Sequence, residues 1–113
     1  MNSRNKGKRG ELELAHVLSE YGYEARRSQQ YAGINNDADV VGLPGIHIEC
    51  KRVEKLNINN AMEQAVRESR THEKPAVFHR TNRVPWKVTM LFDDWMELYQ
   101  SWERDNERIH KDR

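Results

Sequence analysis

Residues 38–52 read ADVVGLPGIHIECKR, and this stretch decides the fold. Pro44 and Gly45 form a turn signal, because proline presets φ and glycine accepts a positive φ. The apolar-rich runs on either side are typical of strands. Together they predict a β-hairpin with strands over residues 38–43 and 46–52.

Side chains alternate between the two faces of a strand, and this decides what the second strand of the hairpin presents. The even-numbered residues from Ile46 to Cys50 are predicted to face the core. The odd-numbered residues face the other way, which puts Glu49 and Lys51 on one face, about 7 Å apart. His47 shares that face and is expected at the surface.

Asp39 lies ten residues before Glu49, and the length of the hairpin loop decides whether the two meet. With a three-residue loop, Asp39 stands opposite Glu49 on the same face. With a two-residue loop, Asp39 would stand opposite Cys50, because a shift of one residue exchanges the two faces. An acidic cluster therefore depends on the register of this hairpin.

Upstream of the hairpin, the apolar residues Leu14, Leu18 and Tyr21 recur with helical spacing. This pattern predicts an amphipathic helix from Gly10 to Tyr21. Glu11 falls on the same stripe, since it precedes Leu14 by three residues. Its carboxylate is therefore predicted to point inward.

The remaining elements complete an α/β arrangement. We predict strands at residues 23–28, 76–78 and 86–91. We also predict a helix at 57–71 with a capping box at Asn60 and Glu63, and a final helix capped by Asp93 or Asp94. This order predicts one domain over residues 1–113, with a mixed sheet of about five strands flanked by helices. Residues 1–9 are expected to form a flexible basic arm, and residues 103–113 a frayed charged tail.

The composition limits the classes of function. Of the 113 residues, 33% are charged, yet 19 Lys and Arg against 18 Asp and Glu leave a net charge of only +1. This balance excludes a polycation that coats nucleic acid, so contacts with DNA must come from a local patch. Cys50 is the one cysteine, which excludes an intrachain disulfide and a cysteine-based zinc cluster. No apolar run approaches the roughly 18 residues of a membrane span, so we expect no membrane partner and a cytoplasmic protein.

Two carboxylates on neighbouring strands beside a lysine point to phosphoryl chemistry. Mg²⁺ takes one or two carboxylates together with water and phosphate oxygens, and Asp39 and Glu49 supply such carboxylates. A bound ion would polarise a phosphoryl oxygen and lower the pKa of a bound water. Lys51 could position or deprotonate that water, or neutralise charge on the phosphate. Glu11 could complete the ligands of the ion.

The same residues resemble the motifs of the PD-(D/E)XK nuclease superfamily, and more narrowly those of the archaeal-type and phage Holliday junction resolvases. The resemblance includes the segment KGKRGELEL at residues 6–14, the helix-ending Gly22 and the pair Arg27-Ser28. It implies a restriction-endonuclease-like core and suggests a prokaryotic or phage origin. The chain departs from the family pattern at Ala38, where the family carries proline before the aspartate. Asp37 shares the face of Asp39 on an extended chain and could substitute for it.

The resemblance also implies a role for each residue of the cluster. The implied ligands of Mg²⁺, or of Mn²⁺ in its place, are Glu11, Asp39, Glu49 and the backbone carbonyl of Cys50. Lys51 is implied as a catalytic residue. Gln64 occupies a place where related nucleases carry a helix glutamine near the site, and a solvated helix face is the alternative.

Basic residues in the first part of the chain are expected to bind DNA phosphates on either side of the site: Arg4, Lys6, Lys8, Arg9, Arg26 and Arg27. The expected function is a Mg²⁺-dependent, structure-selective endonuclease for branched DNA, a Holliday junction resolvase of recombination and repair. The two-fold symmetry of a four-way junction suggests a homodimer. Two alternatives stay open: a non-catalytic nucleic-acid-binding module of the same fold, and a nuclease for flaps, nicks or duplex DNA.

Overall fold

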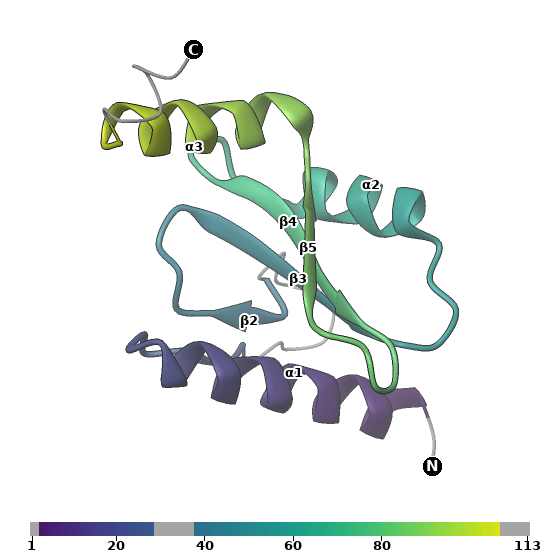
Figure 1. Ribbon diagram of the computed structural model, residues 1–113. Coiled ribbons are helices and arrows are strands. Elements are labelled where there is room, and N and C mark those ends of the chain that lie inside the picture. The colour runs from purple at the N-terminus through teal and green to yellow at the C-terminus, as the bar shows by residue number, and fades with distance from the viewer. Residues whose placement is uncertain (1–2, 29–37, 107–113) are drawn as a thin grey trace.

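The computed structural model describes residues 3–28 and 38–106, with side chains from Gly7 onward (Figure 1). The helices in this part of the chain are α1 (Ser3–Glu20), α2 (Ile58–Glu68) and α3 (Phe92–Arg104). The strands are β1 (Arg26–Arg27), β2 (Val40–Val41), β3 (Ile46–Arg52), β4 (Lys74–Arg80) and β5 (Lys87–Met90). The predicted order of helices and strands is confirmed, although β1 and β2 are shorter than predicted and β4 is longer.

The described strands form one mixed sheet in the order β1-β2-β3-β4-β5. β3 and β4 are parallel, whereas the other neighbouring strands are antiparallel. Parallel neighbours need a crossover connection, and α2 supplies it between β3 and β4 (Figure 1). The predicted α/β class, a mixed sheet flanked by helices, is therefore confirmed.

Helices cover both faces of the sheet. α1 packs on β1, β2 and β3, where Leu14 joins Ile48 in a buried cluster. α2 packs on β3 and β4, where Ala65 joins Val77 in a second cluster. Ile48 pairs with Ala76, so Val77, one residue later, points to the opposite face of the sheet. β3 is therefore enclosed from both sides, and its odd-numbered residues lie beneath α2.

The hairpin register is the one that a three-residue loop requires. Val40 pairs with Ile48, and this register places Asp39 opposite Glu49. Gly42 has a φ of 134°, a conformation that glycine adopts and other residues avoid, and it leads the chain into the turn. The predicted condition for an acidic cluster is thus met.

α1 begins at Ser3 instead of Gly10, so the flexible arm predicted for residues 1–9 is wrong from Ser3 onward. The segment is rich in lysine and arginine, which favour helix, and it contains no proline. Gly10 lies inside the helix, where a Cβ would stand 2.5 Å from the Cβ of Arg52. This glycine therefore allows α1 to lie close to β3.

The other helices also differ from the prediction at their ends. The N-cap of α2 is Asn57, whose side chain accepts a hydrogen bond of 3.0 Å from the backbone N–H of Asn60. The capping box predicted to begin at Asn60 is therefore wrong. α1 ends at Glu20, which leaves Tyr21 exposed and off the predicted buried stripe.

α3 departs from the prediction at both ends. It begins at Phe92 without a side-chain cap, while Asp93 and Asp94 lie in its first turn and complement the helix dipole. Glu103 is buried within α3, so the tail predicted to fray from this residue is helical up to Arg104. Residues 107–113 of that predicted tail lie outside the described part. None of the helices in the described residues has the length and apolar character needed to cross a bilayer.

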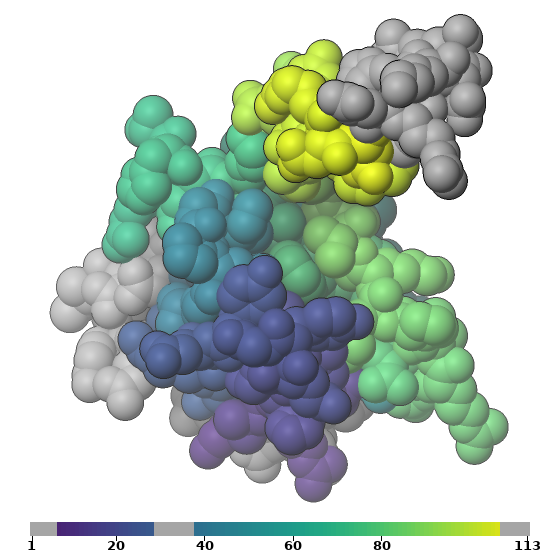
Figure 2. All heavy atoms as spheres, turned by 60° about the vertical axis from the view of Figure 1, so that its left-hand side comes forward, coloured from purple at the N-terminus to yellow at the C-terminus, as the bar shows by residue number. Residues whose placement is uncertain are grey.

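α3 exposes a large part of its apolar surface. Phe92, Trp95, Leu98 and Trp102 are between 47% and 73% exposed. Tyr99 stacks on Trp95, with ring centroids 5.3 Å apart. α3 lies at one end of the molecule and α1 at the other (Figures 1 and 2). The apolar face of α3 is thus left largely uncovered by the described residues.

Candidate active site

Asp39 lies directly before β2, and backbone hydrogen bonds join it to the neighbouring segments on both sides. Its N–H donates to the carbonyl of Ile48 at 2.9 Å, and its carbonyl accepts from the N–H of Ser28 at 3.0 Å. Its side-chain Oδ2 accepts a hydrogen bond of 2.9 Å from the N–H of Cys50. The carboxylate is therefore anchored to β3 at the residue that follows Glu49.

Glu11 projects from α1 toward the same point. Its Oε1 accepts a hydrogen bond of 2.7 Å from Nε of Arg27, within a salt bridge. Burial raises the pKa of the Glu11 carboxyl, the bond from Arg27 opposes this rise, and the charge of Asp39 adds to it. The charge of Lys51 lowers the same pKa. The charges of Asp39 and Lys51 therefore both act on the carboxyl group of Glu11.

Glu49 is fully buried, with 0% of its surface exposed. A hydrogen bond of 3.1 Å joins its Oε1 to Nε2 of His47, and its Oε2 has no hydrogen-bond partner among the described residues. Burial raises the pKa of Glu49 to about 7, because a surrounding of low polarity disfavours the charged carboxylate. The hydrogen bond from His47 opposes this rise, and the charges of Asp39 and Glu68 add to it. Such a carboxylate is suited to take up a proton or a cation.

Cys50 and Lys51 follow Glu49 along β3 and have different surroundings. Lys51 is half-buried, so its ammonium group can reach a molecule bound at the surface. Burial and the carboxylates of Asp39 and Glu11 raise the pKa of the Cys50 thiol. The thiol therefore stays protonated and is unsuited to act as a nucleophile. Cys50 contributes its backbone N–H instead, as the donor to Asp39.

The donor set has the chemistry of ligands for a hard divalent cation, although the ligand atoms of Glu11, Asp39 and Glu49 do not all lie within 4.8 Å of one another in this structure. Glu11, Asp39 and Glu49 offer carboxylate oxygens, the ligands that Mg²⁺ and Mn²⁺ prefer. The raised pKa values of Glu11 and Glu49 reflect burial and an accumulation of negative charge that a cation would relieve. Oε2 of Glu49 adds a buried oxygen without a donor. The residues therefore present the chemistry that Mg²⁺ binding requires.

His47 is buried, with 1% of its surface exposed, so its predicted place at the surface is wrong. The physical reason is that α2 covers the face of β3 that carries it. Its Nε2 contacts Glu49, and its Nδ1 lies 3.7 Å from Oε1 of Glu73. Glu68, at the end of α2, joins the same cluster, since the ligand atoms of His47, Glu49 and Glu68 all lie within 4.8 Å of one another. Glu68 is not among the site residues predicted from the sequence.

Gln64 reaches this cluster through Glu68. Its Nε2 donates a hydrogen bond of 3.3 Å to Oε1 of Glu68, one turn further along α2. Residues four apart on a helix lie side by side. That spacing is the one signal in the sequence that could have led from Gln64 to Glu68.

The basic residues predicted to bind DNA fall into separate groups. Lys8 and Arg9 are exposed on α1, and Arg26 is exposed on β1. Arg27 is bound to Glu11, a contact that the sequence analysis did not anticipate. The predicted residues that lie outside the described side chains are Arg4, Lys6 and Asp37.

Comparisons with known proteins identify the family of this chain and a solved structure of similar fold. The model of a family described as "Phage putative PDDEXK endonuclease" matches residues 2–112. Among solved structures, the chain is similar in fold to Hjc of Archaeoglobus fulgidus, described as a Holliday junction resolvase from an archaeal hyperthermophile. That match has 23% sequence identity and a TM-score of 0.57, and covers 73% of this chain and 74% of the other. Among curated proteins, no sequence matches this chain. The predicted restriction-endonuclease-like fold and the resemblance to PD-(D/E)XK nucleases are thus confirmed.

Proposed function

Because this chain belongs to the phage putative PDDEXK endonuclease family, we propose that it is a Mg²⁺-dependent, structure-selective DNA endonuclease of the Holliday junction resolvase type. The observation that carries the proposal is the hairpin register that sets Asp39 beside Glu49, together with the charges of Asp39 and Lys51 that both act on Glu11. The proposed reaction is the hydrolysis of a phosphodiester bond by water. The proposed catalytic unit is one domain over residues 1–113.

The proposed ligands of Mg²⁺, or of Mn²⁺ in its place, are Glu11, Asp39, Glu49 and the backbone carbonyl of Cys50. Such an ion, when bound, supplies a Lewis acid for a phosphoryl oxygen and lowers the pKa of water. Asp39 is oriented for this role in advance, because the N–H of Cys50 holds its Oδ2. Arg27 holds the carboxylate of Glu11 in the same manner.

Lys51 is the proposed catalytic residue that acts on the water and the phosphate. Its ammonium group lies near the carboxylate of Glu11, where it can position the attacking water and neutralise charge on the phosphate. The resemblance to PD-(D/E)XK nucleases implies a catalytic role for Gln64 as well. Its hydrogen bond to Glu68 supports a positioning role instead, in which it orients a carboxylate next to Glu49.

Contacts with DNA are proposed for the basic residues at the start of the chain and on β1: Arg4, Lys6, Lys8, Arg9, Arg26 and Arg27. Basic side chains of this kind bind DNA phosphates, and their contribution to affinity falls as the salt concentration rises. They do not read the base sequence. Such contacts support selection of DNA by its branched structure and not by its base sequence.

We also propose a homodimer that forms through α3. Exposed apolar patches of this kind mark protein interfaces, and Trp95 and Trp102 are the largest side chains in this one. A two-fold dimer would place two sites on the two symmetric strands of a junction. The proposed setting is recombination and repair of DNA in the cytoplasm of a prokaryotic or phage-infected cell.

The test is a cleavage assay on labelled DNA that compares a synthetic four-way junction with its linear duplex arms, a flap and a nicked duplex. We expect symmetric cuts in the junction alone, with Mg²⁺ or Mn²⁺, and none with EDTA. A preparation of Asp39→Asn made in parallel excludes a contaminating nuclease. Cutting of every substrate would keep the endonuclease and reject the resolvase. Salt-sensitive binding without cutting in either ion would reject the enzyme in favour of a binding module.

A further inference from the structure

A second group of metal-ligating side chains lies on the other side of Glu49, beneath α2. His47 and Glu49 come from β3, and Glu68 comes from the last turn of α2. Their ligand atoms all lie within 4.8 Å of one another. His47 and Glu49 are buried and Glu68 is half-buried. One nitrogen and at least two carboxylate oxygens therefore meet at a place largely shielded from solvent.

The cluster contains an oxygen that the described residues leave without a partner. Among the described residues no donor group reaches Oε2 of Glu49, although the residue is 0% exposed, and a hydrogen bond between Glu49 and Glu68 requires a proton shared by the two carboxyl groups. Burial of a carboxylate oxygen without a donor or a cation is unfavourable, so such an atom points to a missing ligand. The other oxygen, Oε1, lies 3.1 Å from Nε2 of His47. Two ligand atoms that each lie about 2.1 Å from one ion are about 3.0–3.4 Å apart at octahedral or tetrahedral angles. The distance between Oε1 of Glu49 and Nε2 of His47 therefore suits two ligands of the same ion.

Outer contacts already orient two of the three side chains. Nδ1 of His47 lies 3.7 Å from Oε1 of Glu73, and that same oxygen accepts a hydrogen bond of 2.8 Å from the backbone N–H of Arg70. Nε2 of Gln64 donates to Oε1 of Glu68 at 3.3 Å. A metal-binding histidine commonly faces a carboxylate with its second ring nitrogen, and metal-binding carboxylates are commonly hydrogen-bonded themselves. These contacts match that arrangement.

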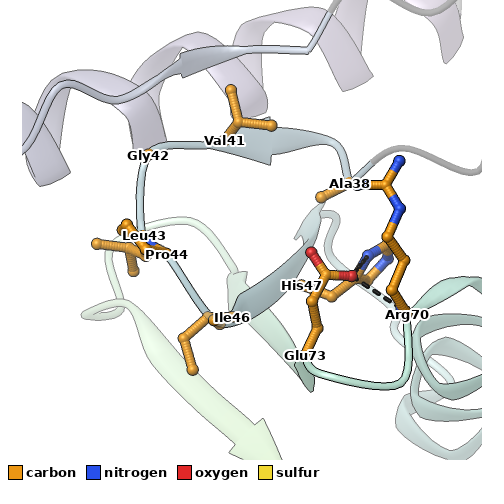
Figure 3. Close-up of a pocket in the computed structure, with 10 residues that line it drawn as sticks. Ala38, Val41, Gly42, Leu43, Pro44, Ile46, His47, Arg70 and Glu73 are labelled. Carbon is orange, nitrogen blue, oxygen red and sulfur yellow. Dashed lines mark hydrogen bonds and ion pairs between the residues drawn. The ribbon is translucent and has the colours of Figure 1, made fainter.

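A pocket borders the cluster at His47, on the hairpin side (Figure 3). Its volume is about 210 Å³, and His47, Arg70 and Glu73 form part of its wall. Figure 3 shows Glu73 and Arg70 from the connection after α2 beside the imidazole of His47 on β3. A hydrated ion could therefore approach His47 without passing the ligands proposed for Mg²⁺.

We propose that His47, Glu49 and Glu68 bind a divalent transition-metal ion, for which Mn²⁺ is the probe. Imidazole nitrogen favours such ions over Mg²⁺, which prefers oxygen ligands alone. The two carboxylates balance the charge of the ion. The site is distinct from the Mg²⁺ ligand set of the proposed function, and Glu49 is the residue they share. The inference rests on the geometry of this cluster and not on DNA cleavage.

The competing explanation is a cluster without any ion, in which a protonated His47 or a proton shared by Glu49 and Glu68 neutralises the carboxylates. Metal-free protein is titrated with Mn²⁺, and free Mn²⁺ is counted by electron paramagnetic resonance. One equivalent of Mn²⁺ should bind about tenfold or more weakly to His47→Gln and to Glu68→Gln than to the wild type. The matched control His16→Gln replaces an exposed histidine on α1 and is expected to bind as the wild type does. Equal Mn²⁺ binding by His47→Gln, Glu68→Gln and the wild type would overturn the proposal.

Two further measurements cover a variant that fails to fold and separate this site from the proposed active site. Electron spin echo measurements on the wild-type Mn²⁺ complex should detect coupling to an imidazole nitrogen, and absence of this coupling would also overturn the proposal. Asp39→Asn should bind one Mn²⁺ ion with wild-type affinity at the site that His47→Gln disrupts. Absence of DNA cleavage by the wild-type protein, with the imidazole-coupled Mn²⁺ still bound, would count against the proposed function alone.

Discussion

The carboxylate of Asp39 accepts a hydrogen bond of 2.9 Å from the backbone N–H of Cys50, so a side chain at the start of β2 is tied to the backbone of β3. This contact keeps Asp39 beside Glu49 in the absence of an ion. Like charges at short distance repel, so the backbone donor offsets part of the unfavourable free energy of holding the two acids together. The acidic cluster is thus built into the hairpin itself.

Substitution of Asp39 by asparagine tests this arrangement. The amide oxygen that takes the place of the carboxylate can still accept from the Cys50 N–H, so the free energy of unfolding should change by less than about 1 kcal/mol. The loss of a charged ligand should reduce junction cleavage by a factor of about 100 or more. Cleavage rates and urea unfolding of Asp39→Asn and of the exposed control Glu63→Gln measure both effects. Cleavage at the wild-type rate would contradict the role of Asp39.

Lys51→Ala separates chemistry from DNA binding. Lys51 is one positive charge near the carboxylates, whereas the proposed phosphate contacts involve several other basic residues. We expect cleavage to fall by a factor of about 100 or more while junction affinity changes by less than about tenfold. Single-turnover cleavage and a gel-shift titration at the same salt concentration measure the two quantities. A parallel loss of affinity and cleavage would instead assign Lys51 to DNA binding.

The pKa of Glu49 predicts how the stability of the metal-free protein depends on pH. Burial raises this pKa from its ordinary value of 4.5 to about 7, so the folded protein holds its proton more tightly than the unfolded chain does. The stabilisation is full below pH 4.5 and is lost as pH rises through about 7. Burial lowers the pKa of His47, but the hydrogen bond to Glu49 and the charges of Glu49, Glu73 and Glu68 together raise it, so His47 acts in the same direction.

Unfolding in EDTA at pH 5 and pH 8 measures this effect. The loss of stability between the two pH values should be larger in the wild type than in Glu49→Gln, by on the order of 2 kcal/mol. Added Mn²⁺ should restore stability at pH 8 in the wild type, because an ion that binds only the folded state stabilises it. The same pH dependence in both proteins would show that Glu49 titrates at its ordinary pKa.

The exposed aromatic residues of α3 predict a change of oligomeric state. Trp95→Asp and Trp102→Asp place charges in the proposed dimer interface and should convert a dimer into a monomer. Tyr21→Asp is the matched control, since Tyr21 is 79% exposed on the connection after α1. Sedimentation equilibrium gives the mass of each protein. A wild type that stays monomeric at high concentration would reject the dimer.

Two glycines of α1 provide a matched pair for the packing of this helix. A Cβ at position 10 would lie 2.5 Å from the Cβ of Arg52, whereas a Cβ at position 7 has no atom within 4 Å. Gly10→Ala should therefore destabilise the protein by about 1–3 kcal/mol. Gly7→Ala should stabilise it by up to about 1 kcal/mol, because alanine favours helix. Thermal unfolding distinguishes the two, and equal shifts would argue against close packing of α1 on β3.

The hairpin and its carboxylates were predictable because their determinants are local. Pro44 and Gly45 specify the turn, and the alternation of side chains then places Asp39 and Glu49 on one face as soon as the register is known. Helical periodicity likewise predicts that Glu11 points inward. The start of α1 was mispredicted because the cluster of basic residues before Gly10 suggested an exposed arm, although these residues also favour helix.

The amino-acid sequence by itself therefore determined the hairpin, the order of the elements and the set of acids around Asp39. Only the tertiary structure decided the burial of His47 and its meeting with Glu68. The alternation of a strand assigns His47 to a face, but it does not state what covers that face. The crossover between the parallel strands β3 and β4 lays α2 over it and brings together side chains about twenty positions apart in the chain. Contacts of this kind arise from packing between elements, and no local pattern encodes them.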